Sequence, residues 1–220
     1  MKDIPFYSNR EDNLSCFLAC LRSALEYFSN KSWSWEELET LTGFQKNKTA
    51  WTVKTWTTLS QQGFDINMIE GFDYKKYYDE GESYLSTFLN PEELSWQQEH
   101  SNISEIRPFI PEFLKTVHFE QKSPTLKYID ELLDKDYLVI VQLNSSALND
   151  DEGYISHAVL VYDSTEDEYI AHDPGNHDSG ISGRHISKAK LYKAMGGNNN
   201  TVEVTGIKVG ETTPSKGLTN

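Results

Sequence analysis

The stretch HAVLVYDSTEDEYIAHDPG, residues 157–175, decides the fold class because it reads as two short strands joined by a polar turn. The runs 157–162 and 168–171 favour strands, and the turn-forming residues between them predict an antiparallel hairpin. In such a hairpin the start of the first strand lies beside the end of the second. His157 opens the first strand and Asp173 ends the second, so we expect their side chains to meet.

Around this hairpin, the chain has a helix-rich first part and a strand-rich second part. The expected helices are 16–28, 34–43, 50–62, about 125–133 and about 187–195, and the other expected strands are 64–70, 137–143 and 201–209. Residues 72–116 carry three prolines and are expected to form short helices and loops inserted between two lobes. This order predicts a single domain, 1–220, of the α+β class. We expect a helical lobe to about residue 116, an antiparallel sheet lobe over 117–210 and a frayed tail, 211–220.

Composition and charge exclude several classes of function. The 220 residues are 37% hydrophobic, which is enough for a sizeable core. Thirty-four acidic residues against 20 Lys and Arg give a net charge of −14, which disfavours partners such as nucleic acid or an anionic membrane surface. No apolar run approaches the roughly 20 residues of a membrane span. The N-terminus lacks the apolar run of a secretory signal, so we expect a cytoplasmic protein.

The two cysteines are the first candidates for chemistry, and they exclude a disulfide scaffold. Cys16 begins the first expected helix, where unpaired N–H groups and the helix dipole stabilise a thiolate. A thiolate is a competent nucleophile, so Cys16 is the candidate nucleophile. Cys20 lies one turn further along, where the dipole has faded, and is expected in the core. From position alone, Cys16 could equally be a small apolar residue at a helix start.

A nucleophilic cysteine needs a base, and His157 is the candidate. Taken alone, a strand histidine is more often a hydrogen-bonded structural residue than a catalytic one. The hairpin, however, places Asp173 where its carboxylate can accept a hydrogen bond from one imidazole nitrogen while the other nitrogen faces a thiol. The combination of Cys16, His157 and Asp173 therefore favours acyl transfer through a thioester.

Four segments in order resemble the papain-like peptidases of the bacteriocin-processing type, which cut leader peptides after a double glycine. They are IPFYSN (4–9), CFLACL (16–21), HAVLVYD (157–163) and HDPG (172–175). The resemblance covers most of the chain except the insertion. It implies a papain-like fold with the active site between the two lobes, a peptide or small amide substrate, and no cofactor.

The resemblance also assigns roles and shows two departures from the family pattern. It implies that Cys16 is the nucleophile, His157 the base and Asp173 the residue that orients the base. The family's glutamine that donates to the oxyanion is replaced by Asn9, or by Arg10 when counted strictly back from the cysteine. Asn9 keeps an amide donor on a shorter stem. The glycine after the nucleophile is Phe17 here, and both departures bear on catalytic efficiency more than on fold.

Three other interpretations remain open or weakly supported. The same cysteine could pass its acyl group to an amine, which would make the protein an acyltransferase or transpeptidase. The domain could also be a degenerate, non-catalytic papain-like binding module. A metal site is disfavoured, because the possible ligands match no closed zinc spacing. Those residues are His172, Asp173, His177 and Asp178.

Overall fold

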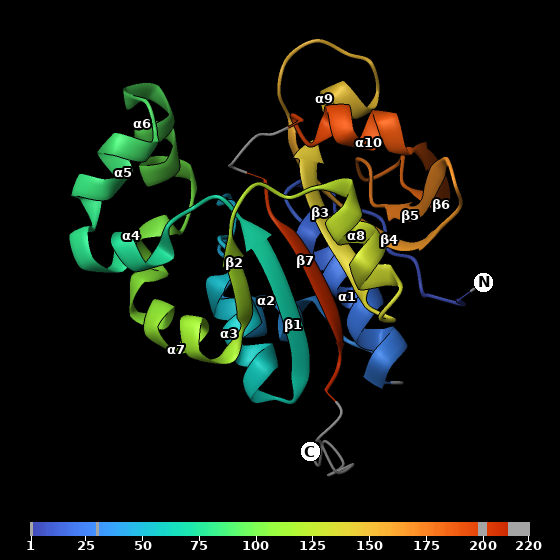
Figure 1. Cartoon of the computed structure of the whole chain (residues 1–220), viewed down its shortest axis with the longest axis horizontal. Coiled ribbons are helices and arrows are strands. Elements are labelled where there is room, and N and C mark those ends of the chain that lie inside the picture. Colours follow the sequence, from blue (N-terminus) through green and yellow to red (C-terminus); the bar gives the residue numbers. More distant parts are fainter. Residues whose placement is uncertain (1, 30, 198–201, 211–220) are drawn as a thin grey trace.

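A computed structural model describes residues 2–29, 31–197 and 202–210 as helices packed around a mixed sheet (Figure 1). The strands of this sheet are β1 (Phe64–Glu70), β2 (His118–Gln121), β3 (Leu138–Asn144), β4 (Ser156–Ser164), β5 (Glu168–Asp173), β6 (Ile181–Ser187) and β7 (Val204–Val209). In the described part of the chain they form one seven-stranded sheet in the order β2-β1-β7-β3-β4-β5-β6. The β1–β2 pair is parallel and the other pairs are antiparallel. The α+β class expected from the sequence is confirmed.

The helices fall into two groups along the chain. Before the central strands come α1 (Cys16–Ser29), α2 (Trp35–Thr42), α3 (Val53–Gln61), α4 (Tyr74–Glu80), α5 (Glu82–Phe88), α6 (Pro91–His100) and α7 (Ile110–Thr116), with 3-10 turns η1 (Ile103–Glu105) and η2 (Arg107–Phe109). Later come α8 (Leu126–Leu133), α9 (Ser145–Leu148) and α10 (Lys188–Ala194). The capping box expected at the start of α2 is present, with Ser34 and Glu37 each bonded to the other's backbone, and Gly43 ends that helix in the left-handed conformation.

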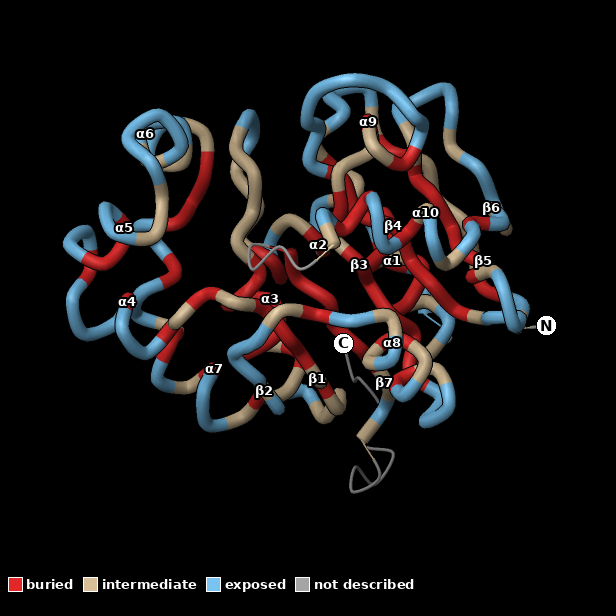
Figure 2. Tube along the Cα trace, turned by 45° about the horizontal axis from the view of Figure 1, so that its top comes forward, coloured by how far each residue is buried: buried red, intermediate tan, exposed pale blue. Residues whose placement is uncertain are grey.

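The central strands are buried on both faces, which explains their nearly continuous apolar sequence. On β3, Leu138 and Ile140 belong to a core that includes α1 and α3, whereas Val139 and Val141 belong to a second core with α8 and α10. Because side chains alternate along a strand, a strand covered on both sides reads as an apolar run. Figure 2 shows the resulting buried band through β3, β4 and α1.

Three elements differ from the sequence-based expectations. The first is β1, which pairs with β7 and so brings part of the chain before residue 116 into the sheet. The second is β6, an edge strand in a stretch where the sequence predicts no strand. The third is the short β2, which pairs with β1 in parallel. The tail predicted to be frayed, 211–220, lies outside the described residues.

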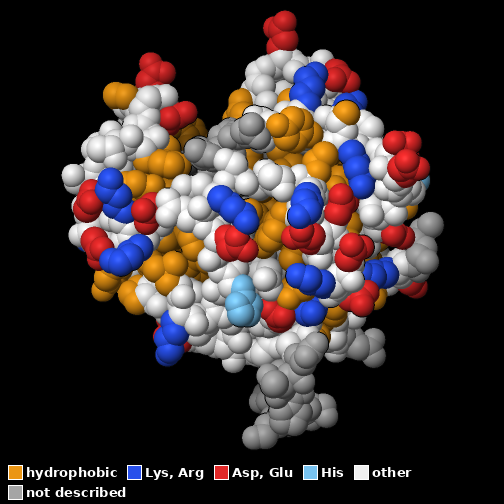
Figure 3. All heavy atoms as spheres, viewed as in Figure 1, with side chains coloured by type: hydrophobic (Ala, Val, Ile, Leu, Met, Phe, Trp, Pro, Cys, Tyr) orange, Lys and Arg blue, Asp and Glu red, His pale blue; other side chains and the backbone are white. Residues whose placement is uncertain are grey.

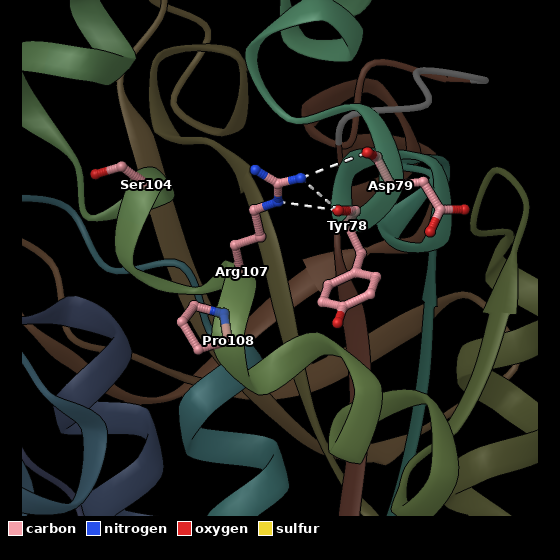
Figure 4. A pocket seen from close by; sticks show the side chains of 5 residues that line it. All are labelled: Tyr78, Asp79, Ser104, Arg107 and Pro108. Carbon is pink, nitrogen blue, oxygen red and sulfur yellow. Dashed lines mark hydrogen bonds between the residues drawn. The ribbon is translucent and has the colours of Figure 1, made fainter.

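Residues 72–116 form the short helices and turns that the sequence predicts. Figure 2 shows α5 and α6 largely exposed at one end of the molecule, and none of the residues of α6 is buried. Arg107 holds this region together, because its Nε and Nη2 atoms donate to the Tyr78 carbonyl at 2.9 and 2.7 Å (Figure 4). The shallow hollow around Arg107, about 530 Å³, is lined only by residues between 78 and 108.

No helix in the described ranges is both long and apolar enough to cross a membrane. Charged side chains of both signs are scattered over the face seen in Figure 3, where no large patch of basic residues appears.

Candidate active site

The candidate nucleophile lies at the first residue of α1. Cys16 is half-buried, and the segment before it is fixed because Ser15 N–H donates to Asn9 Oδ1 at 2.8 Å. Helix α1 packs along β4, where the Cys20 thiol approaches the Ala158 carbonyl oxygen at 3.5 Å. The helix therefore carries Cys16 to the end of β4 at which His157 is found.

The hydrogen bond that the hairpin predicts is present. His157 Nε2 lies 2.7 Å from Asp173 Oδ1, and both side chains are buried. Strands β4 and β5 are antiparallel, with Leu160 opposite His172. Extending this register makes His157 and Asp173 diagonal neighbours, which lie within reach of each other across a strand pair. The remaining ring nitrogen, Nδ1, is the one that Asp173 leaves available for Cys16, whose thiol is near enough for His157 to lower its pKa.

The electrostatics favour a charged pair at Cys16 and His157. Burial raises the pKa of the Cys16 thiol, but the nearby His157 and its positive charge outweigh burial and bring this pKa below its usual value. Backbone N–H groups of Phe17 and Ala158 also lower it. Burial alone would lower the pKa of His157, but its hydrogen bond to Asp173 and its interaction with the Cys16 thiolate raise it to about 10. A thiolate beside an imidazolium is the reactive form of such a site.

Cys20 has the opposite character. It is 1% exposed, and burial raises its pKa well above the ordinary value, with the nearby charges of Cys16 and Asp173 acting in the same direction. It is a neutral core thiol, as the sequence predicts.

Asp173 is held by three donors at once. Burial would raise its pKa, but the bond to His157, the Gly175 N–H at 2.9 Å and the guanidinium of Arg184 lower this pKa to about 2. Arg184 Nη1 lies 2.5 Å from Asp173 Oδ2. Arg184 is part of β6, a strand that the sequence did not reveal, so sequence reasoning missed it. A basic residue eleven positions after the candidate aspartate was the only available signal.

The candidate oxyanion donor, Asn9, is 4% exposed and lies beside the Pro174–Gly175 turn. Its Nδ2 donates to the Gly175 carbonyl at 3.2 Å and its Oδ1 accepts from the backbone N–H groups of Arg10 and Ser15. Its own N–H donates to the Pro174 carbonyl at 3.0 Å. Asn9 thus connects the entrance of α1 to the turn after Asp173.

Arg10, the other position considered for the oxyanion donor, is engaged elsewhere. Its Nε donates to Ser15 Oγ at 2.8 Å and its Nη1 to Glu39 at 2.7 Å. The guanidinium lies about 5 Å above the rings of Trp35 and Phe44. This side chain forms one wall of an open groove of about 850 Å³ whose lining also includes Asn9.

The Phe17 side chain points into the core rather than over the site. It makes an edge contact with Trp56, with ring centroids 5.5 Å apart. Because Phe17 is 8% exposed, an aromatic residue is accommodated where the resembling family has glycine.

The four residues considered as metal ligands do not share a site. His172 Nε2 bonds the Ile4 carbonyl oxygen at 2.9 Å, and exposed His177 pairs with Asp178. Across residues 2–29, 31–197 and 202–210, no group of three or more His, Cys, Asp or Glu side chains is arranged to hold a metal ion.

Comparison with known proteins gives a distant structural likeness. No protein-family model matches the sequence, and no curated protein matches it. Among solved structures, the peptidase domain of Streptococcus ComA, a bifunctional ABC transporter involved in a quorum-sensing pathway, is similar over 93% of this chain and 97% of that domain, with 13% sequence identity and a TM-score of 0.46. A likeness this distant assigns no role to any residue of this chain.

Proposed function

We propose that this protein is a papain-like cysteine hydrolase that cleaves a peptide or amide bond. One observation carries the proposal: the buried imidazole of His157 bonds Asp173 through Nε2, and the Cys16 thiol at the start of α1 lies close enough for His157 to lower its pKa. A core histidine needs partners, but it does not need a helix-terminal thiol whose pKa is lowered by it. The three groups match the roles of base, orienting carboxylate and nucleophile.

The reaction follows from these positions. The Cys16 thiolate attacks the substrate carbonyl carbon, and the π electrons move to the oxygen, which becomes an oxyanion. The backbone N–H of Cys16 and the Asn9 amide are the candidate donors to this oxyanion. His157 gives its Nδ1 proton to the nitrogen of the leaving amine as the C–N bond breaks, which leaves a thioester on Cys16. His157 then takes a proton from water, the water oxygen attacks the thioester, and the acid departs with regeneration of the thiolate–imidazolium pair.

The substrate class is a peptide or a small amide. The groove beside Asn9 has aromatic walls and charged groups of both signs, which suits a peptide better than a uniformly apolar ligand. Asn9, the candidate oxyanion donor, lines this groove, so we expect a bound peptide to place its scissile carbonyl at the Asn9 end.

An electrophilic peptide probe tests the proposal. We expect a peptidyl epoxide to form one covalent adduct, located at Cys16 by mass spectrometry. Cys16→Ala should abolish the adduct, whereas the matched variant Cys20→Ala should retain it. His157→Ala should slow its formation by about 10²-fold or more, since the base and the charge that stabilises the thiolate are both lost. A folded wild-type protein that gives no adduct at Cys16 between pH 6 and 8 would support the non-catalytic binding module instead.

A further inference from the structure

We propose that Arg184 is a positioning residue for the candidate triad: by holding the outer oxygen of Asp173, it orients this carboxylate toward His157 and limits the pH range over which His157 stays charged. The inference rests on the proposed function. It assigns a task to a residue that belongs neither to the hairpin nor to the resembling sequence segments.

The geometry gives Arg184 a direct hold on the carboxylate. Asp173 uses Oδ1 for His157 and Gly175 and uses Oδ2 for Arg184, so the plane of the carboxylate is fixed from two sides. The Arg184 side chain is 17% exposed, and register pairing places its backbone opposite Ala171, two residues before Asp173. A planar guanidinium with several fixed donors restricts a carboxylate more tightly than a single ammonium does.

The second end of the guanidinium fixes Arg184 itself. Its Nη2 donates to Asn149 Oδ1 at 2.8 Å, and Asn149 is the C-cap residue that follows α9. The next residue, Asp150, pairs with Lys190 and Lys193 of α10, at 2.8 and 3.2 Å. The guanidinium therefore spans from the buried carboxylate to an anchored segment at the surface.

The charge of Arg184 acts on His157 through Asp173. The guanidinium and the imidazolium bond opposite oxygens of one carboxylate, so their nearest nitrogens are at most about 7 Å apart. Two cations at that separation repel each other. The positive charge of Arg184 therefore opposes the protonation of His157, which the negative charge of Asp173 favours. The ionisable groups facing His157 and Asp173 are Cys16 and Cys20 on α1 and Arg184 on β6.

Removing the positive charge of Arg184 should therefore raise the pKa of His157. With a neutral residue at 184, His157 would lose its proton at a pH higher by about 1 to 2 units, from a repulsion at about 7 Å in a medium of effective dielectric constant about 20. An arginine that only supports the fold of β6 would leave the pKa of His157 where it is, because its charge would not act on the imidazolium.

The experiment compares Arg184→Gln, Arg184→Met and Arg184→Lys with wild type. Cys16 alkylation by iodoacetamide is followed from pH 4 to 11, and the upper pH limit of His157 is measured by NMR with ¹³C-labelled histidine. We expect the two neutral variants to raise the pKa of His157 by about 1 to 2 pH units. We also expect them to lower the maximum rate at which Cys16 is alkylated. Arg184→Lys, which keeps the positive charge, should have the wild-type pKa of His157 but a reduced alkylation rate of Cys16. Asn149→Ala, which removes only the outer hydrogen bond, should keep the wild-type limit.

The outcomes separate this inference from the proposed function. Wild-type Cys16 that is unreactive at pH 6 would contradict the proposed function itself. Reactive wild-type Cys16 together with an unchanged or lowered limit in the folded neutral variants would overturn only the role of Arg184. If neither neutral variant folds, Arg184→Lys decides the question. A lower maximum alkylation rate of Cys16 with an unchanged pKa of His157 supports the positioning role. A variant that equals wild type in both quantities refutes it.

Discussion

A buried carboxylate at the end of β1 should make the stability of this protein fall as pH rises. Glu70 is 6% exposed and accepts a hydrogen bond from Tyr74 at 2.6 Å. Glu203, 3% exposed, lies one residue before β7, next in register to the Ile69–Val204 pair. Burial, followed by the charge of Glu203, raises the pKa of Glu70 from 4.5 to about 8. Glu203 itself is surrounded by donors: Thr52, Trp56, Gln142 and Thr205.

The sign and size of the effect follow from proton linkage. Below pH 4.5 Glu70 is protonated in both the folded and the unfolded chain, so it adds no pH dependence. Between 4.5 and about 8 only the folded state keeps the proton, and the free energy of unfolding falls by about 1.4 kcal/mol per pH unit. The total loss by pH 8 has an upper limit of about 5 kcal/mol, a large share of a typical folding free energy.

Glu70→Gln isolates this contribution. Glutamine keeps the length of the side chain and a carbonyl oxygen for Tyr74, but it cannot ionise. We expect the variant to be more stable than wild type at pH 8, by a few kcal/mol at most, and to have a flatter pH dependence between 5 and 8. Urea unfolding followed by tryptophan fluorescence at several pH values measures both. Glu120→Gln, on exposed β2, is the matched control and should keep the wild-type slope. Equal slopes for wild type and Glu70→Gln would refute the reasoning.

Two further predictions concern the site itself. At pH 6, iodoacetamide should modify Cys16 before Cys20, because the pKa of the first thiol is lowered and that of the second is raised; peptide mapping that finds Cys20 modified first would reverse the assignment of the nucleophile. Asn9→Ala should lower turnover by about 10²-fold and also reduce stability by about 1–3 kcal/mol, since Ser15 N–H and the Gly175 carbonyl both lose a buried partner. Asn9→Asp keeps the acceptor for Ser15 and loses the amide donor, so in activity assays and urea unfolding it should be inactive but more stable than Asn9→Ala.

The parts of the site that lie on local structure could be predicted from the sequence. A helix start makes Cys16 a candidate nucleophile, and a hairpin of 19 residues, 157–175, predicts that His157 and Asp173 meet. The structure places these groups as the hairpin requires, with 2.7 Å between His157 and Asp173.

The parts of the site that depend on the pairing of strands far apart in the sequence could not be predicted. Strand β6 reads ISGRHIS, with Gly183 in its middle and a mostly exposed surface, so it lacks the alternation that marks a half-buried strand. Without β6, nothing in the sequence places Arg184 against Asp173. Likewise, Glu70 and Glu203 become neighbours only because β1 and β7 pair across more than a hundred residues. Single-sequence patterns carry no information about such partners.

The N-terminal segment before α1 has a consequence for the order in which the molecule is made. Residues Ile4, Asn9 and Asn13 bond His172, Gly175 and His177, partners that are 164 to 168 positions away. A ribosome releases the thiol-bearing helix early and the turn that anchors its entrance about 160 residues later. A partly synthesised chain therefore holds Cys16 without its base and without this clamp. The candidate site is therefore complete only after the turn that follows Asp173 has emerged.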